Sequence, residues 1–337
     1  MKLSFKPLKE QVMVITGASS GIGLATAQEA ARHGTRLVVA SRNEAALATL
    51  VNQIRTGGGE AVYVVADVGL REDVQRIADT AIERFGGFDT WVNNAGMAIW
   101  GRLEAVSDED HRRLFETNFW GTVYGSLIAV GHLKQRGGSL INIASAAADL
   151  ALPLQGMYSA SKHAVKGFTD ALRMELAEEK APISVTTIKP AGINTPLPQH
   201  AQNYMDQEPK LPPPVYEPKE VALAILHAAT HAERDIYVGS AAKMMSMGNK
   251  YAPELMDWVG EKILFDQQRR SEPARHSAGA LHRSGSDGSV HGDHPGPVMK
   301  TSFYTRASLH PLITGAALAT IGLAAMVWLS AGRTKSW

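Results

Sequence analysis

Short apolar runs alternate with longer amphipathic segments from residue 12 onward. Val12–Thr16 is apolar and rich in β-branched residues, which is typical of a parallel strand buried on both faces. Glu72–Phe85 repeats its apolar residues at helical spacing. The predicted strands are Val12–Thr16, Arg36–Ala40, Ala61–Ala66, Thr90–Asn93, Ser139–Ala144, Ile183–Lys189 and Asp235–Val238, and the predicted helices include Leu24–His33, Asn43–Arg55, Glu72–Phe85, Asp108–Lys134, Met157–Glu179 and Pro218–His231.

Strands that alternate with helices predict an α/β fold: a Rossmann-like, doubly wound parallel sheet of about seven strands with helices on both faces. We expect one domain over residues 1–270. In such sheets ligands bind beyond the carboxyl ends of the strands. The chemically distinctive residues follow the strands at that edge: Gly17, Arg42, Asp67, Asn94, Ser145 and Pro190.

Residues 195–218 interrupt this rhythm with seven prolines. Long insertions in compact domains are often lids or binding loops, so we expect this loop to cover a ligand site; an exposed connector is the alternative.

Residues 271–308 are rich in Ser, Gly, His, Pro and Arg, which predicts a flexible linker. Its histidines are irregularly spaced and lack a carboxylate cluster, so solvated side chains are favoured over a metal site. Leu312–Ala331 follows as 20 residues without a charge, enough for a helix to cross a bilayer. We therefore predict a transmembrane helix at 309–332 and a basic tail at 333–337, with a buried globular helix as the alternative.

Composition narrows the classes of function further. The 337-residue chain is 45% hydrophobic, and its formal net charge of +1 gives no case for nucleic-acid binding. The absence of cysteine excludes disulfides, thiolate catalysis and cysteine-ligated zinc. Residues 1–11 are polar and lack the apolar stretch of a secretory signal. Together with the predicted C-terminal helix, this predicts a single-pass membrane anchor with the folded domain in the cytoplasm.

A glycine-rich turn joins the first strand to the first helix. Gly17, Gly21 and Gly23 lie within seven residues, between a predicted strand and a predicted helix. Glycines let the backbone approach a pyrophosphate, and the helix N-terminus offers free N–H groups. An ordinary tight turn is the alternative to a dinucleotide site.

Tyr158 and Lys162 are four residues apart in a predicted helix, so they project from one face. An ammonium near a phenol stabilises the phenolate and makes it a usable proton donor and acceptor near neutral pH. Ser145 lies thirteen residues earlier and could reach the same reacting oxygen. By itself such a pair also arises by chance on helices.

Five motifs in order resemble the classical short-chain dehydrogenases/reductases: T-G-A-S-S-G-I-G at Thr16–Gly23, N-N-A-G at Asn93–Gly96, Asn118, Ser145 and Y-S-A-S-K at Tyr158–Lys162. The intervals of 27, 13 and 4 residues from Asn118 onward match the catalytic tetrad of that family. The resemblance covers about residues 8–240 and implies an NADP(H)- or NAD(H)-dependent oxidoreductase.

The resemblance implies a role for each member of the tetrad. Tyr158 is the general acid or base, and Lys162 lowers its pKa and binds the nicotinamide ribose. Ser145 donates a hydrogen bond to the substrate oxygen. Asn118 interrupts its long helix and holds a water that links Lys162 to solvent. The resemblance also implies a homodimer or homotetramer, and that the loop at 195–218 folds over the substrate.

The residues at the end of the second predicted strand indicate which cofactor is preferred. NAD sites commonly place an acidic residue there, whereas this chain has Ser41 and Arg42. A guanidinium suits a 2′-phosphate, so NADP(H) is favoured, with NAD(H) as the alternative. The predicted cofactor-binding residues are Gly17, Ser19, Ser20, Gly21, Ile22, Gly23, Ser41, Arg42, Asp67, Val68, Asn94, Ala95, Gly96, Tyr158, Lys162, Pro190, Gly192, Ile193 and Thr195.

One position departs from the family pattern. The family commonly has P-G-x-x-x-T after the sixth strand, whereas Ala191 follows Pro190 here and Gly192 comes next. A requirement for positive φ would then move by one residue. We expect cofactor binding to survive, with a changed local backbone.

The predicted substrate is a small hydrophobic alcohol or ketone, because the expected pocket walls are mostly apolar. They are Met97, Ala98, Ile99, Trp100, Ala147, Leu150, Leu152, Leu154 and the 195–214 loop. Two alternatives stay open: a soluble NAD-dependent alcohol dehydrogenase whose tail helix packs in an oligomer, and a cofactor-sensing regulatory or scaffold protein on the same fold.

Overall fold

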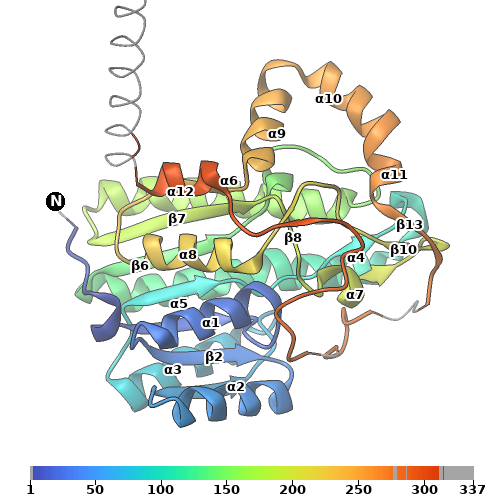
Figure 1. Ribbon diagram of the computed structural model, residues 1–337. Helices are drawn as coiled ribbons and strands as arrows, with labels where there is room; N and C mark the ends of the chain where they lie inside the picture. The colour runs from blue at the N-terminus through green and yellow to red at the C-terminus, as the bar shows by residue number, and fades with distance from the viewer. Residues whose placement is uncertain (1–2, 276–278, 286, 311–313, 315–337) are drawn as a thin grey trace, which may run out of the picture.

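The computed structural model describes residues 3–275, 279–285, 287–310 and 314. Its centre is a seven-stranded parallel sheet in the order β12-β7-β6-β4-β1-β2-β3 (Figure 1). The strands are β1 (Val12–Thr16), β2 (Arg36–Ser41), β3 (Ala61–Val65), β4 (Thr90–Asn93), β6 (Gly138–Ile143), β7 (Ile183–Pro190) and β12 (Asp235–Val238).

Two apolar layers cover the faces of this sheet. On one face α1 (Gly21–Arg32), α2 (Glu44–Thr56) and α8 (Pro218–Ala228) pack against strand residues such as Ile15 and Ile188. On the other face α3 (Arg71–Phe85), α5 (Gly121–Arg136) and α6 (Gly156–Glu178) pack against Val14 and Leu140. Successive strand residues point to opposite faces, so nearly continuous apolar strands supply both cores.

The predicted doubly wound α/β fold is confirmed. β1, β4 and β12 have the predicted bounds, and the other four strands differ by one residue at one or both ends. The helix predicted over 108–134 is divided into α4 (Asp108–Phe115), the π-helical turn η3 (Glu116–Trp120) and α5. A π-turn inside a helix is frequently a functional site, and Asn118 lies at its centre.

The proline-rich loop at 195–218 is built from short elements. It contains α7 (Leu197–His200), β9 (Gln202–Asn203), β10 (Gln207–Pro209) and β11 (Val215–Tyr216). β9 pairs with β5 (Ile99–Trp100), and β11 pairs with β8 (Gly192–Ile193). These ladders hold the loop over the carboxyl ends of the main strands.

The described part of residues 271–308 differs from the predicted flexible linker, because it packs along the domain (Figure 1). β13 (Arg269–Pro273) pairs with β10, and β14 (Val298–Met299) pairs with β11. α12 (Phe303–Leu309) docks on α8, where Arg306 forms an ion pair of 2.8 Å with the buried Glu220. A few anchors suffice to hold a segment whose average composition is polar.

The predicted membrane anchor is not supported by the structure. Within the described ranges, no helix is both long and apolar enough to cross a membrane. α12 spans seven residues, whereas a crossing helix needs about 20. Apart from residues 309, 310 and 314, the predicted span at 309–332 and the tail at 333–337 lie outside the described residues.

Candidate active site

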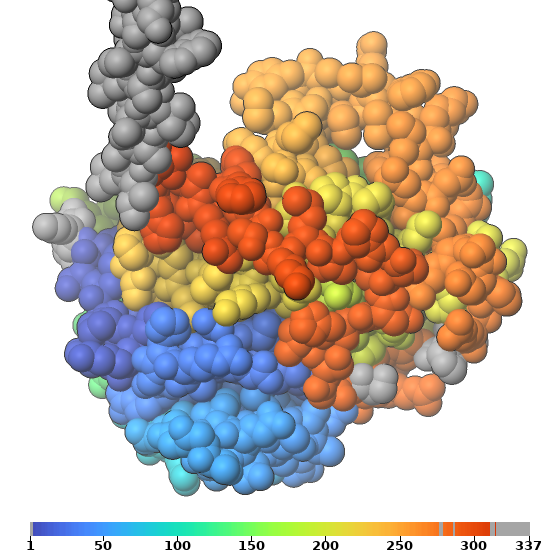
Figure 2. All heavy atoms as spheres, viewed as in Figure 1, coloured from blue at the N-terminus to red at the C-terminus, as the bar shows by residue number. Residues whose placement is uncertain are grey.

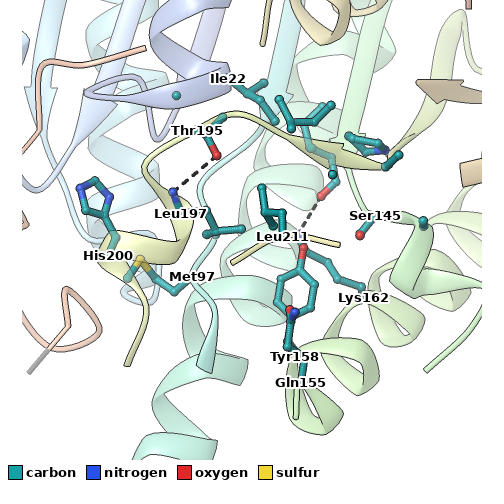
Figure 3. Close-up of a pocket in the computed structure, with 18 of the residues that line it drawn as sticks. Ile22, Met97, Ser145, Gln155, Tyr158, Lys162, Thr195, Leu197, His200 and Leu211 are labelled. Carbon is teal, nitrogen blue, oxygen red and sulfur yellow. Dashed lines mark hydrogen bonds between the residues drawn. The ribbon is translucent and has the colours of Figure 1, made fainter. Parts of the chain in front are cut away.

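A cavity of about 590 Å³ lies at the carboxyl ends of the strands, within the range usual for ligand sites. Figure 3 shows Ser145, Tyr158 and Lys162 on one side of it and Thr195, Leu197 and His200 on the other. Of the predicted site residues, Gly23 and Asn118 lie behind the wall and the rest line the cavity. One surface thus gathers residues that follow all seven strands of the sheet.

The glycine-rich turn forms the cavity wall at the start of α1. Gly17 has φ +66°, and a Cβ there would stand 2.7 Å from Cα of Ala95. A Cβ on Gly23 would stand 2.1 Å from the Gly17 carbonyl oxygen. The Asn94 amide donates to the Thr16 and Gly17 carbonyls at 2.9 and 3.1 Å. Only glycine permits this packing, which fixes the loop against the Asn94–Gly96 segment.

Tyr158 and Lys162 project from the first turns of α6 toward Ser145, which precedes the 3₁₀ turn η4 (Ala146–Ala148). Lys162 is 4% exposed, and its Nζ lies 5.7 Å from the centre of the Tyr158 ring. Nζ donates to the Ile143 carbonyl oxygen at 3.0 Å. The three predicted catalytic side chains therefore meet at one end of the cavity.

Burial sets the protonation of this pair. Contrary to the lowering by Lys162 that the resemblance implies, burial raises the pKa of Tyr158 above its ordinary value, and a hydrogen bond with Ser145 offsets part of that rise. Desolvation lowers the pKa of Lys162 to about 8. Both effects disfavour the charged form of a buried group. Near neutral pH the phenol therefore keeps its proton and the amine is still mostly charged.

Asn118 holds the backbone behind the catalytic side chains. Its Oδ1 accepts from the Met97 N–H at 2.8 Å, and its Nδ2 donates to the Met97 carbonyl at 2.9 Å and to Ser161 Oγ at 3.1 Å. Asn118 is fully buried. It thus ties the loop after β4 to α6, and the predicted water relay stays a prediction.

Charged residues line the far end of the cavity. Arg42 donates to the carbonyl oxygens of Ala280 and Leu281 at 2.5 and 3.0 Å. Asp67 forms an ion pair with Arg113 and accepts from the Gly69 N–H at 2.9 Å. Burial is the largest effect on Arg42 and lowers its pKa.

The departure at Ala191 has a simple structural outcome. In the described chain, neither Ala191 nor Gly192 is among the residues with positive φ. The Ala191 N–H donates to the Val238 carbonyl at 2.9 Å, and Gly192 pairs with Val215 in β8 and β11. Because neither position requires positive φ, alanine is tolerated where the family commonly has glycine.

The predicted pocket walls are partly wrong. Met97, Leu152 and the 195–214 loop contribute, whereas Ala98, Ile99, Trp100, Ala147, Leu150 and Leu154 are buried behind the wall. The sequence reasoning missed the helices α9 (Ser240–Tyr251) and α10 (Pro253–Val259) and the turn η5 (Gly260–Leu264). Apolar residues at helical spacing in 240–264 were the available signal. These elements line the cavity with Met244, Met245, Met256, Val259, Ile263 and Leu264.

Comparisons with known proteins agree with this geometry. A family model described as short chain dehydrogenase matches residues 11–206. The uncharacterized oxidoreductase YxnA of Bacillus subtilis (strain 168) is 45% identical over 338 residues, covering 99% of this chain and 94% of that protein. An 11-beta-hydroxysteroid dehydrogenase A of Sesamum indicum is 33% identical over 260 residues, covering 74% of each. The chain belongs to the short-chain dehydrogenase family and is an oxidoreductase of that family.

Solved structures show the same fold with nicotinamide cofactors. A short chain dehydrogenase/reductase from Burkholderia phymatum in complex with NAD has a TM-score of 0.67 at 28% identity, covering 74% of this chain and 96% of that one. An alcohol dehydrogenase from Thermococcus sibiricus complexed with 5-hydroxy-NADP has a TM-score of 0.60 at 25% identity, covering 67% and 95%. The two neighbours differ in cofactor, so the fold alone does not set the preference.

Proposed function

We propose that this protein uses NADP(H) to interconvert a hydrophobic secondary alcohol and its ketone, with Tyr158 as general acid and base. The observation that carries the proposal is the convergence of Ser145, Tyr158 and Lys162 on one end of a cavity whose wall continues along the glycine-rich turn.

The residues present fit a dinucleotide. A Cβ on Gly96 would stand 3.5 Å from both Lys162 Nζ and Asn118 Oδ1, so glycine leaves room beside Lys162. Thr117 also lines the cavity, and its Oγ1 is buried without a hydrogen-bond partner in the described chain. Gly17–Ile22 would hold the pyrophosphate, Asp67 and Val68 the adenine, and Lys162 the nicotinamide ribose. When bound, the cofactor supplies or accepts the hydride.

Tyr158 performs the proton transfer at its hydroxyl. Because burial raises its pKa, the phenol is protonated at neutral pH and can donate to a developing alkoxide. Ser145 donates a second hydrogen bond to the same oxygen and stabilises its negative charge. Lys162, with a pKa of about 8, supplies a nearby cation that stabilises the phenolate left behind.

Apolar walls support a hydrophobic substrate. Beside the catalytic end, the cavity is bounded by Leu152, Leu211, Met245, Met256 and Leu264. Methionine side chains adapt to ligands of varied shape. The 11-beta-hydroxysteroid dehydrogenase among the relatives supports a rigid polycyclic alcohol as the first class to test.

NADP(H) is favoured because Arg42 stands after β2, where NAD sites commonly have an acidic residue. Its guanidinium has five N–H donors and uses two on the carbonyls of Ala280 and Leu281. Donors therefore remain for a 2′-phosphate.

Tyr158→Phe tests the proposal directly. We expect turnover of a steroid ketone with NADPH to fall by about 10²–10⁴-fold, since a general acid is lost. Binding of NADPH, followed by its fluorescence, should stay within about threefold of the unmodified protein. Arg42→Asp in the same titration should reverse the preference toward NADH. Full turnover by Tyr158→Phe contradicts the mechanism, and binding of neither dinucleotide by the unmodified protein contradicts the enzymatic function and favours a regulatory or scaffold role.

A further inference from the structure

A segment near the C-terminus crosses the cofactor end of the cavity. We call residues 279–285 and 287–292 the strap. Figure 2 shows this dark-orange part of the chain lying beside the blue N-terminal helices. Ala280, Ser284, Gly285 and Asp287 of the strap line the cavity together with the glycine-rich turn.

The strap is bound at the end where the 2′-phosphate of NADP(H) would lie. Its Ala280 and Leu281 carbonyls accept from Arg42, and Leu281 also accepts from Arg113 Nε at 3.3 Å. The Leu281 side chain is fully buried and packs in a cluster with Met97 and Leu114. The buried Leu281 side chain therefore anchors the strap next to its hydrogen bonds with Arg42 and Arg113.

The strap is also bound to the backbone that would cradle the pyrophosphate. Gly21 N–H, at the start of α1, donates to the Ser289 carbonyl at 2.9 Å, and Gly288 N–H donates to the Ser19 carbonyl at 2.9 Å. Farther along, Gly292 N–H approaches the Asn194 carbonyl at 3.4 Å. The strap thus runs along the cavity from Arg42 to Asn194 in the loop after β7.

The strap covers the cavity without filling it. The volume of about 590 Å³ remains with the strap in this position. The strap is thus bonded at once to Arg42, the glycine-rich turn and Asn194, along the side of the cavity where the dinucleotide would lie.

We propose that the strap is the outer wall of the cofactor site, and that the dinucleotide enters and leaves only when the strap opens. This inference rests on the cofactor placement in the proposed function. It predicts that strap opening sets both the association and the release rates of the cofactor. If the strap merely contacted the cofactor, a substitution in it would instead change the affinity of the protein for the cofactor.

The substitution Gly288→Ala tests whether strap opening limits both rates. Gly288 has φ +97° and open space where a Cβ would stand, so alanine strains the closed strap without meeting the cavity. Gly58→Ala is the matched control, since Gly58 has φ +83°, open space, and a place after α2 away from the site. In the full chain, stopped-flow fluorescence with NADPH should show association and release both faster by about 5- to 30-fold in Gly288→Ala. The dissociation constant should stay within about threefold, and Gly58→Ala should leave both rates unchanged.

Amide hydrogen exchange of the unmodified full chain supplies an independent readout. NADPH should slow exchange at Gly288 and Gly292, whose N–H groups are donors in the closed strap. Faster exchange with NADPH would mean that strap and cofactor compete, which overturns the inference. Unchanged rates in Gly288→Ala with normal NADPH binding also overturn it but leave the proposed function intact. Binding of neither dinucleotide overturns both.

Discussion

Lys162 is predicted to lower the stability of the folded protein. Its side chain is buried, and the pKa falls from 10.5 in its ordinary state to about 8. An unfolded chain therefore binds more protons than the folded one between these two values, and stability rises with pH across that window. Below pH 8 the full penalty is present, about 3 kcal/mol at one pKa unit per 1.36 kcal/mol.

Replacing this lysine with methionine removes the penalty and keeps the apolar volume. Lys162→Met also deletes the hydrogen bond to the Ile143 carbonyl, which costs about 1–2 kcal/mol. At pH 7 the variant should therefore be more stable by about 1–2 kcal/mol, as when a buried charge gives way to an apolar residue. At pH 10 the penalty has shrunk to about 1 kcal/mol, so the gain should vanish or reverse. The variant should also lose most of its turnover.

Urea unfolding at pH 7 and pH 10 measures the expected gain in stability at pH 7 and its expected loss or reversal at pH 10. Lys166→Met is the control, because Lys166 lies one turn farther along α6 with a side chain 36% exposed and a surface ion pair to Asp170. It should change stability by about 0.5 kcal/mol or less at either pH. A Lys162→Met protein that is less stable at pH 7, or whose difference does not fall as pH rises, would refute the reasoning.

Two further substitutions test the packing that supports the site. Asn142→Leu should lower the free energy of unfolding by about 2–4 kcal/mol, because Asn142 accepts from Asn93 at 2.8 Å and donates to Thr169 at 2.9 Å in the buried core. Urea unfolding checks this, and a loss below about 1 kcal/mol would contradict it. Gly131→Ala, in the interior of α5 with open space where a Cβ would stand, should instead stabilise the protein by about 0.5–1 kcal/mol. A fall in the melting temperature of Gly131→Ala would show that this surface is not free, as in the predicted oligomer.

The elements of the sheet could be predicted because each depends on local pattern. Continuous β-branched runs such as Val12–Thr16 pack on both faces, and the amphipathic helices between them bury one face each. The site was predicted for the same reason: the carboxyl ends of parallel strands meet at one edge, so Gly17, Ser145 and Tyr158 are brought together by topology.

Other features depend on contacts that no local pattern records. The backbone at Ala191 is held by its hydrogen bond to Val238 of β12, and Met245 lines the cavity because α9 packs beside it. Residues 271–308 show most clearly what a local pattern does not predict. Its average composition predicts a linker, yet Leu281 is fully buried.

The sequence by itself therefore determined the doubly wound fold, the family and the convergence of the predicted catalytic residues. Periodicity and spacing along the chain carry that information. Only the tertiary structure decided that the strap lies across the Arg42 end of the cavity and that residues from α9 to η5 line it. The strap joins segments more than two hundred residues apart, through the bonds between Arg42 and the carbonyls of Ala280 and Leu281. These arrangements rest on a few long-range contacts rather than on a repeating pattern.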